Sequence, residues 1–308
     1  MLNDNEFIIQ SLNSTLFFLR TTRFYCLNIE LSFFKNNMEY SNRAKELGRR
    51  CEELGRKIID YTYGYIPEAA KKYQIYVTDY SLRSELLTEK LFDVDIDTGI
   101  TEEQLNFKVG VSGVAPESLI NNIIDANNEA LEITVDFLSF AEEIRNLLIM
   151  NELFSYSYPE LYNFMMRDVK QFQDDLTRIM ERLKPDPVFS ANSEFTYNTT
   201  MLEIVLFLRG FIDISEVKYL NDLNYFILSY PSLIRDYQTL PLTPENQKEL
   251  TERSIAITER LRNLIAEMLE RLLNAELYFI VEATMIDNFY TNVNYFYYLL
   301  KENESISF

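Results

Sequence analysis

Helical periodicity is the feature that most restricts the fold of this 308-residue chain. Apolar residues recur every three or four positions in several long segments, and one segment carries Ala44, Leu47, Cys51, Leu54 and Ile58. This spacing places the apolar side chains on one face of a helix. Only seven glycines and eight prolines are present, which is few turn-forming residues for an all-β protein of this length. We therefore predict an all-α protein.

Further segments show the same spacing and carry helix-start signals. One of them places apolar residues at Ile120, Ile124, Leu131, Val135 and Leu138. Another begins after Tyr158, where Pro159 suits the first turn of a helix because its missing N–H has no partner there. A third follows 243–245, which supplies an N-cap threonine, a proline and an acid. The last segment, 289–298, is rich in aromatic residues.

The clearest domain boundary is the polar stretch 184–198, which contains Pro185 and Pro187. We expect a first helical bundle with an insertion over residues 1–186 and a second bundle over residues 187–308. A weak internal repeat agrees with this division, since Phe18-Leu19-Arg20 near the start of the first half recurs as Phe207-Leu208-Arg209 in the second.

A short non-helical insertion is expected near residues 92–113, as a loop or a hairpin, because Val94, Ile96, Phe107 and Val109 alternate with polar residues. The same stretch contains Asp93, Asp95, Asp97 and Gly99, which resemble a calcium loop. An EF-hand requires glycine at its sixth position and glutamate at its twelfth, where this chain has Thr98 and Gln104. An acidic surface turn is the favoured interpretation, and calcium binding is a minor alternative.

Charge and composition exclude several classes of partner. Lysine and arginine total 29 against 48 acids, and the net charge of −19 disfavours binding to nucleic acid or to an anionic membrane. Positive partners or ions are favoured instead. The apolar runs are too short to span a bilayer. The first ten residues carry Asp4 and Glu6 without a basic cluster, so no signal peptide is expected.

The two cysteines, Cys26 and Cys51, lie among apolar residues and are expected to be buried thiols rather than a disulfide. Together with the missing signal peptide, they predict a cytoplasmic protein.

Histidine is absent, and this removes most catalytic chemistry. Neither a Ser–His nor a Cys–His pair can form. The glycines are scattered, so no phosphate-binding loop is present, and two cysteines cannot make a structural zinc site unaided. Carboxylate sites for hard ions such as magnesium, calcium or manganese remain. We predict no catalytic residue, no cofactor and no metal site, and therefore a protein that is not an enzyme.

Segments along nearly the whole chain resemble one family. Residues 17–31, FFLRTTRFYCLNIEL, resemble its first helix, FW-x-R-x-x-x-EH-A-L-F, and residues 80–101, YSLRSELLTEKLFDVDIDTGIT, resemble its inter-helix insertion. Residues 158–169, YPELYNFMMRDV, are similar to a segment with EH-x-L-RE. Residues 203–216, EIVLFLRGFIDISE, resemble EHALFIRGLLDPTE, and residues 287–297 resemble DHM-x-RE-x-x-YYL.

The family is an uncharacterised one, a domain of unknown function from spore-forming bacteria. The resemblance implies two tandem four-helix bundles of hemerythrin-like or ferritin-like type, with metal held by Glu-His and His-x-x-x-Glu pairs. The positions that correspond to those ligands are Phe24 and Tyr25, Phe164 and Asp168, Glu203 and Ile204, and Asn288 and Asn292.

Carried onto this chain, the resemblance implies that the metal site is lost in both halves. One isolated carboxylate per bundle, Asp168 or Glu203, cannot hold a dinuclear site. Phe24, Phe164 and Ile204 would fill the space of the ligands, and the bundle centre would be repacked with apolar side chains. The two carboxylates are then expected to be partly exposed or paired with local donors.

Three functions follow from these observations. The first is a non-catalytic structural or self-assembling protein on a degenerate metal-bundle scaffold, in a spore-associated lattice, filament or inclusion. Self-association would use aromatic surfaces, namely Tyr61, Tyr63, Tyr65 and the terminal aromatic helix, and the apolar chain ends at 7–9 and 306–308. The alternatives are a metal-binding or storage protein that uses only Asp168 and Glu203, and a protein-binding module or toxin component.

Overall fold

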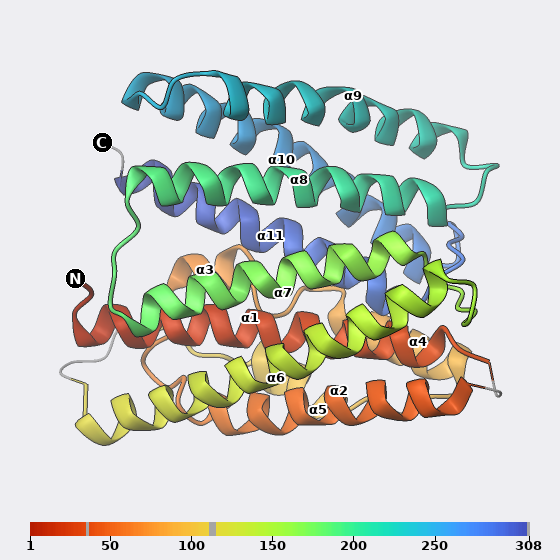
Figure 1. Cartoon of the computed structure of the whole chain (residues 1–308), viewed down its shortest axis with the longest axis horizontal. Coiled ribbons are helices and arrows are strands. Elements are labelled where there is room, and N and C mark those ends of the chain that lie inside the picture. Colours follow the sequence, from red (N-terminus) through yellow and green to blue (C-terminus); the bar gives the residue numbers. More distant parts are fainter. Residues whose placement is uncertain (35–36, 111–114, 307–308) are drawn as a thin grey trace. The chain divides into compact units, whose positions relative to one another are not determined.

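The computed structural model describes residues 1–34, 37–110 and 115–306. Within these ranges the chain forms helices and no strand (Figure 1), which confirms the predicted all-α fold. No helix of the described residues meets the length and apolarity that a membrane span requires. The helices are α1 (Asp4–Leu31), α2 (Met38–Ile59), α3 (Glu68–Lys72), α4 (Ser81–Phe92), α5 (Thr98–Leu105), α6 (Glu117–Ile149), α7 (Pro159–Met180), α8 (Pro187–Phe211), α9 (Val217–Thr239), α10 (Pro244–Leu273) and α11 (Ala283–Ile306).

The chain divides into two compact units. Unit 1 consists of Met1–Lys72 and Val94–Lys184, and unit 2 consists of Tyr73–Asp93 and Pro185–Phe308. The junction after Lys184 lies within the polar stretch expected to hold the boundary. The segment Tyr73–Asp93 differs from the expectation, because it was assigned to the first bundle and the structure groups it with unit 2.

In unit 1 the long helices α1, α2, α6 and α7 pack against one another. Helix α1 is buried along nearly its whole length, because α2, α6 and α7 all contact it. The predicted apolar face of α2 is confirmed, since Leu47, Cys51, Leu54 and Ile58 are buried. Helix α6 is present as predicted, but its expected face is wrong: Val135 is 60 % exposed.

In unit 2 the long helices α8, α9, α10 and α11 pack together, and α4 lies against α10 and α11. The start of α10 follows the sequence signal, because the Thr243 side chain accepts a hydrogen bond from Asn246 N at 3.2 Å and Pro244 is the first helical residue. The aromatic residues of α11 are buried, so this helix belongs to the core of unit 2 and is not the aromatic surface that was expected.

Two helices of unit 1 can be compared with two helices of unit 2 by the residues at which they begin. Helices α2 and α9 begin at Met38 and Val217, a shift of 179 residue numbers, whereas α7 and α11 begin at Pro159 and Ala283, a shift of 124. One buried polar pair in each unit has residue numbers that differ by these same shifts. Thr15 Oγ1 donates to Asn127 Oδ1 at 3.1 Å in unit 1, and in unit 2 Thr251 Oγ1, which corresponds to Asn127, donates to Glu194 Oε2, which corresponds to Thr15, at 2.7 Å.

The tripeptide repeat proposed from the sequence does not follow these shifts. A shift of 179 pairs Phe18 with Tyr197 rather than with Phe207. The recurrence of Phe-Leu-Arg stays a weak prediction from the sequence.

The stretch expected to be a non-helical insertion contains helix α5 (Thr98–Leu105). No hairpin forms within its described residues, because Val109 makes an isolated parallel bridge with Ile66 instead. Residues 111–113 lie outside the described part of the chain. The helix escaped prediction because the alternating apolar residues stand on either side of it.

Candidate functional site

The positions that resemble lost ligands in the first half meet at the centre of unit 1. Helix α1 contributes Tyr25, and α7 contributes Phe164 and Asp168 one turn apart. The Tyr25 hydroxyl donates to Asp168 Oδ2 at 2.9 Å. The Tyr25 ring stands edge-on to Phe164 with centroids 6.0 Å apart, and lies 6.3 Å from Phe137 of α6. The centre is filled by three aromatic rings around one hydrogen-bonded carboxyl group.

Burial dominates the electrostatics of Asp168. The residue is only 8 % exposed, and desolvation raises the pKa of its carboxyl group to about 6, while the hydrogen bond from Tyr25 acts in the opposite direction. The group that donates a hydrogen bond to Asp168 Oδ2 is the neutral phenol of Tyr25, not a cation. This confirms the expected pairing of Asp168 with a local donor.

Phe24 lies in a different environment from its neighbour Tyr25. Its ring packs with Leu27 and with Ile96, which precedes α5. The guanidinium carbons of Arg20 and Arg23 each lie 5.0 Å from the centre of the Phe24 ring, within range of a cation–π interaction. Phe24 therefore helps to fix the chain before α5 and does not contribute to the bundle centre.

The equivalent positions of unit 2 are amides and an aliphatic side chain. Ile204, Asn288 and Asn292 are buried, and Asn292 Nδ2 donates to the Asn288 carbonyl oxygen at 3.1 Å. Glu203 is half-buried. The shift of 124 relates Phe164 to Asn288 and Asp168 to Asn292. Phe164 and Asp168 thus lie as far from the start of α7 as Asn288 and Asn292 lie from the start of α11.

These residues do not fit a dinuclear metal centre. At its centre, unit 1 has a single carboxyl group, that of Asp168, which is already hydrogen-bonded to Tyr25. Aromatic rings occupy the surrounding space. Across the described residues, no three Cys, Asp or Glu side chains gather closely enough to hold an ion. In the acidic turn, Asp97 is paired with Arg56, while Asp93 ends α4.

A cleft of about 640 Å³ lies between α1, α2 and residues 95–98 of unit 1. Its charges are compensated internally: Arg23 Nε lies 2.9 Å from Glu52 Oε1, and Lys45 Nζ lies 3.7 Å from Glu30 Oε1. Burial raises the pKa values of Glu30 and Glu52. With its cations and carboxylates paired to each other, the cleft does not define a ligand class.

Cys26 and Cys51 are free and buried in unit 1, as the sequence predicted for buried thiols. Burial raises the pKa of Cys26 well above its usual range and that of Cys51 to about 12. A thiol reacts as its thiolate, so we expect neither cysteine of the native protein to react with a disulfide reagent at pH 8. Both should react in denaturant, which serves as the control. Rapid modification of one thiol before unfolding would contradict the burial described above.

The N-terminal apolar segment packs on its own chain. Phe7 and Ile8 are buried, and the Arg182 guanidinium lies 4.5 Å from the centre of the Phe7 ring within unit 1. The expectation that this end docks into a neighbouring subunit is therefore wrong. The corresponding expectation for 306–308 falls on side chains outside the described part of the structure.

Exposed aromatic surface lies elsewhere than expected. Of the tyrosines before Pro67, Tyr63 is 80 % exposed but Tyr65 is buried. A second group, missed in the sequence, consists of Phe34, Phe154 and Tyr156, which we call the exposed ring cluster. Its centroids lie 4.8 to 5.8 Å apart although each side chain is at least 46 % exposed. The rings come from separate loops, so local periodicity could not reveal them.

Fold and site define an all-α protein of two helical units with an aromatic centre in the first. No protein-family model matches the chain. It is 23 % identical over 255 residues to the spore coat protein CotB of Clostridioides difficile (strain 630), covering 83 % of each chain. Its structure is similar to that of an uncharacterised protein from Bacillus cereus G9241, with a TM-score of 0.71 and 12 % identity over 99 % of this chain and 93 % of that chain. The second likeness concerns the fold alone.

Proposed function

We propose that this protein is a non-catalytic structural component of the bacterial spore coat. The observation that carries the proposal is its similarity to CotB over most of both chains. The chemistry of the site is compatible with this proposal, because the Asp168 carboxyl group is hydrogen-bonded to Tyr25 in a space filled by aromatic rings. Such a centre stabilises a scaffold and leaves no room for a substrate.

The exposed ring cluster supports a finer proposal, that the protein associates with itself or with other coat proteins. Contiguous exposed apolar surface is a mark of protein–protein contact, and aromatic residues are enriched where such contacts are strongest. Phe34, Phe154 and Tyr156 offer three adjoining rings of this kind.

Localisation during sporulation tests the proposal. We expect the full chain, fused to a fluorescent protein and produced in sporulating Clostridioides difficile, to collect around the forespore and to be recovered in coat extracts. A matched variant carries Phe34→Ser, Phe154→Ser and Tyr156→Ser. It should fold normally but be recovered in smaller amounts around the forespore and in coat extracts. The fluorescent protein alone is the control for trapping. A fusion that remains diffuse in the mother cell would argue against a coat function.

A further inference from the structure

The segment Tyr73–Asp93, which we call the arm, is flanked by two chain segments of unit 1 that pair with each other. Ile66 pairs with Val109, and Gly110 N donates to the Ile66 carbonyl oxygen at 3.2 Å. Lys71 Nζ donates to the Phe107 carbonyl oxygen at 2.7 Å. The chain segments before and after the arm are thus hydrogen-bonded to each other within unit 1.

The chain that returns from the arm is also held on unit 1. Arg23 Nη2 donates to the Asp97 carbonyl oxygen at 3.0 Å, and Arg20 Nη1 donates to Thr101 Oγ1 at 3.1 Å. Both arginines come from α1 and are buried. Both ends of the arm are therefore anchored on unit 1, whereas the arm itself is part of unit 2.

Within unit 2, the arm is fixed by buried hydroxyl groups. The Asp287 carboxylate of α11 accepts hydrogen bonds from Thr78 Oγ1 and, at 2.7 Å, from Ser81 Oγ. One face of α4 continues this contact, with Thr88 Oγ1 3.3 Å from Thr284 Oγ1. All five side chains are at most 2 % exposed. Buried polar groups need matched partners, so this contact is specific for the arm sequence.

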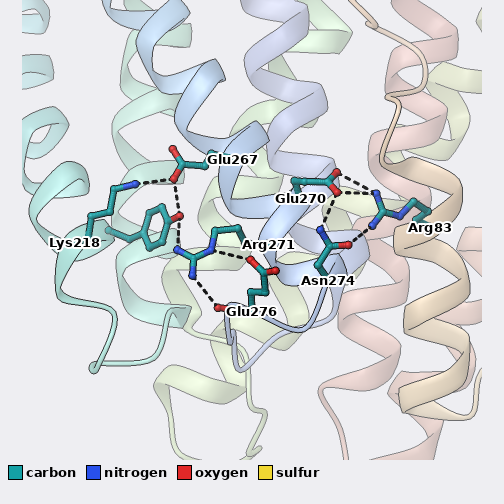
Figure 2. Close-up of polar contacts among 8 residues, drawn as sticks. Arg83, Lys218, Glu267, Glu270, Arg271, Asn274 and Glu276 are labelled. Atoms are coloured by element: carbon teal, nitrogen blue, oxygen red, sulfur yellow. Dashed lines mark hydrogen bonds and ion pairs between the residues drawn. The ribbon is translucent and has the colours of Figure 1, made fainter.

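Charged and amide contacts border the hydroxyl groups. Arg83 Nη1 lies 3.0 Å from Glu270 Oε2, and Arg83 Nη2 donates to Asn274 Oδ1 at 2.9 Å (Figure 2). Figure 2 shows that α10 also uses Glu267 toward Lys218 of α9. Helix α10 thus binds the arm with the same kind of ion pair that it makes to α9.

The arm has hinges close to both ends. Its buried part combines hydroxyl groups, which water can solvate when the arm is undocked, with the apolar side chains of Ile75, Tyr76 and Val77. Gln74 and Asp93, close to its two ends, have left-handed backbone with φ of 58° and 56°. Neither is glycine, so both conformations are strained, and strained hinges favour exchange of the segment they bound.

We infer that the face of α10 and α11 around Glu270, Thr284 and Asp287 is an interaction surface for the arm of a second copy of this chain. An exchanged arm makes the contacts already described, so no additional complementary surface is required. Straightening at Gln74 and Asp93 releases the hinge strain. Each chain both donates and accepts an arm, which permits closed dimers and open chains. This inference extends the proposed function and does not depend on it, because exchange can be measured in the purified protein.

Disulfide trapping between two full-length chains tests the exchange. Thr88→Cys is introduced into one chain and Thr284→Cys into a differently tagged chain, and the two are co-expressed and oxidised. We expect a covalent heterodimer, with peptides joined through positions 88 and 284, at least tenfold above the control. The control replaces Thr88→Cys with Leu91→Cys, because Leu91 is on the same helix but 66 % exposed.

A chain that carries both substitutions is the second measurement. If this chain closes internally while the mixed chains give no heterodimer, the arm docks only in its own chain and exchange is refuted. If it fails to close within itself or with another copy, the Thr88–Thr284 contact is absent and the inference is also overturned. A failure of forespore localisation leaves both readouts unchanged, so the two proposals fail independently.

Discussion

Replacing Asp287 with alanine is expected to lower the free energy of unfolding of unit 2 by about 2–6 kcal/mol, since two buried hydroxyl groups lose their acceptor at a cost of about 1–3 kcal/mol each. Thr78 and Ser81 both donate to this carboxylate. The arm should then open, and trypsin should cleave faster after Lys72 and Arg83. Urea unfolding and limited proteolysis measure the two effects.

The matched control is Glu270→Ala, which removes a different contact of the same arm. The ion pair between Arg83 and Glu270 joins side chains that are 45 % and 47 % exposed. Exposed ion pairs contribute about 0–1 kcal/mol, so this variant should remain close to the native protein in both measurements. Equal losses in Asp287→Ala and Glu270→Ala would contradict the assignment of the buried hydroxyl contacts as the anchor of the arm.

Asp168→Asn is expected to change how stability depends on pH. Burial raises the pKa of the Asp168 carboxyl to about 6 in the folded chain. The folded state therefore binds this proton more tightly than the unfolded state. Its contribution to stability is complete at low pH and is lost as pH rises through about 6, a total of about 3 kcal/mol by proton linkage. Asparagine does not titrate, so the variant lacks this loss.

The measurement is the difference in unfolding free energy between the two proteins at several pH values. Between pH 5 and pH 8 this difference should move in favour of Asp168→Asn by about 1.5 kcal/mol, as the same linkage relation requires. The matched control is Asp174→Asn, which makes the same substitution at an exposed position of the same helix, away from the aromatic centre. A pH-independent difference for Asp168→Asn would show that the carboxyl is not held in a dehydrated site.

Local spacing was sufficient to predict the class of fold and the start of two helices. Leu47, Leu54 and Ile58 are buried at helical intervals, and Pro159 and Pro244 begin α7 and α10. In α6 the same reasoning selected the wrong face, because Ile123, Ala130 and Phe137 form the buried stripe beside it. A helix with apolar residues on more than one side has an ambiguous orientation until its neighbours are known.

The site was predictable in its location but not in its chemistry. The resemblance to a metal-binding family singled out Tyr25, Phe164 and Asp168, which the structure brings together. The hydrogen bond between Tyr25 and Asp168 forms because α1 packs against α7, and no local sequence pattern predicts that packing. For a similar reason, the sequence does not show which helices the arm packs against. The hydrogen bonds that hold it to α11 are made by polar residues, whereas periodicity detects apolar faces.

The distance along the sequence between the arm and its anchor has a consequence for synthesis. Thr78 leaves the ribosome 209 residues before Asp287, so the surface that receives the arm does not exist when the arm is made. Segments with exposed apolar surface aggregate during such delays. The face of α4 built from Ser81, Ser84 and Thr88 is hydroxyl-rich and can be hydrated before α11 is made, whereas Ile75, Tyr76 and Val77 of the arm are apolar. Unit 2 consequently completes its fold only after α11 has been synthesised and meets a segment that was made 209 residues earlier.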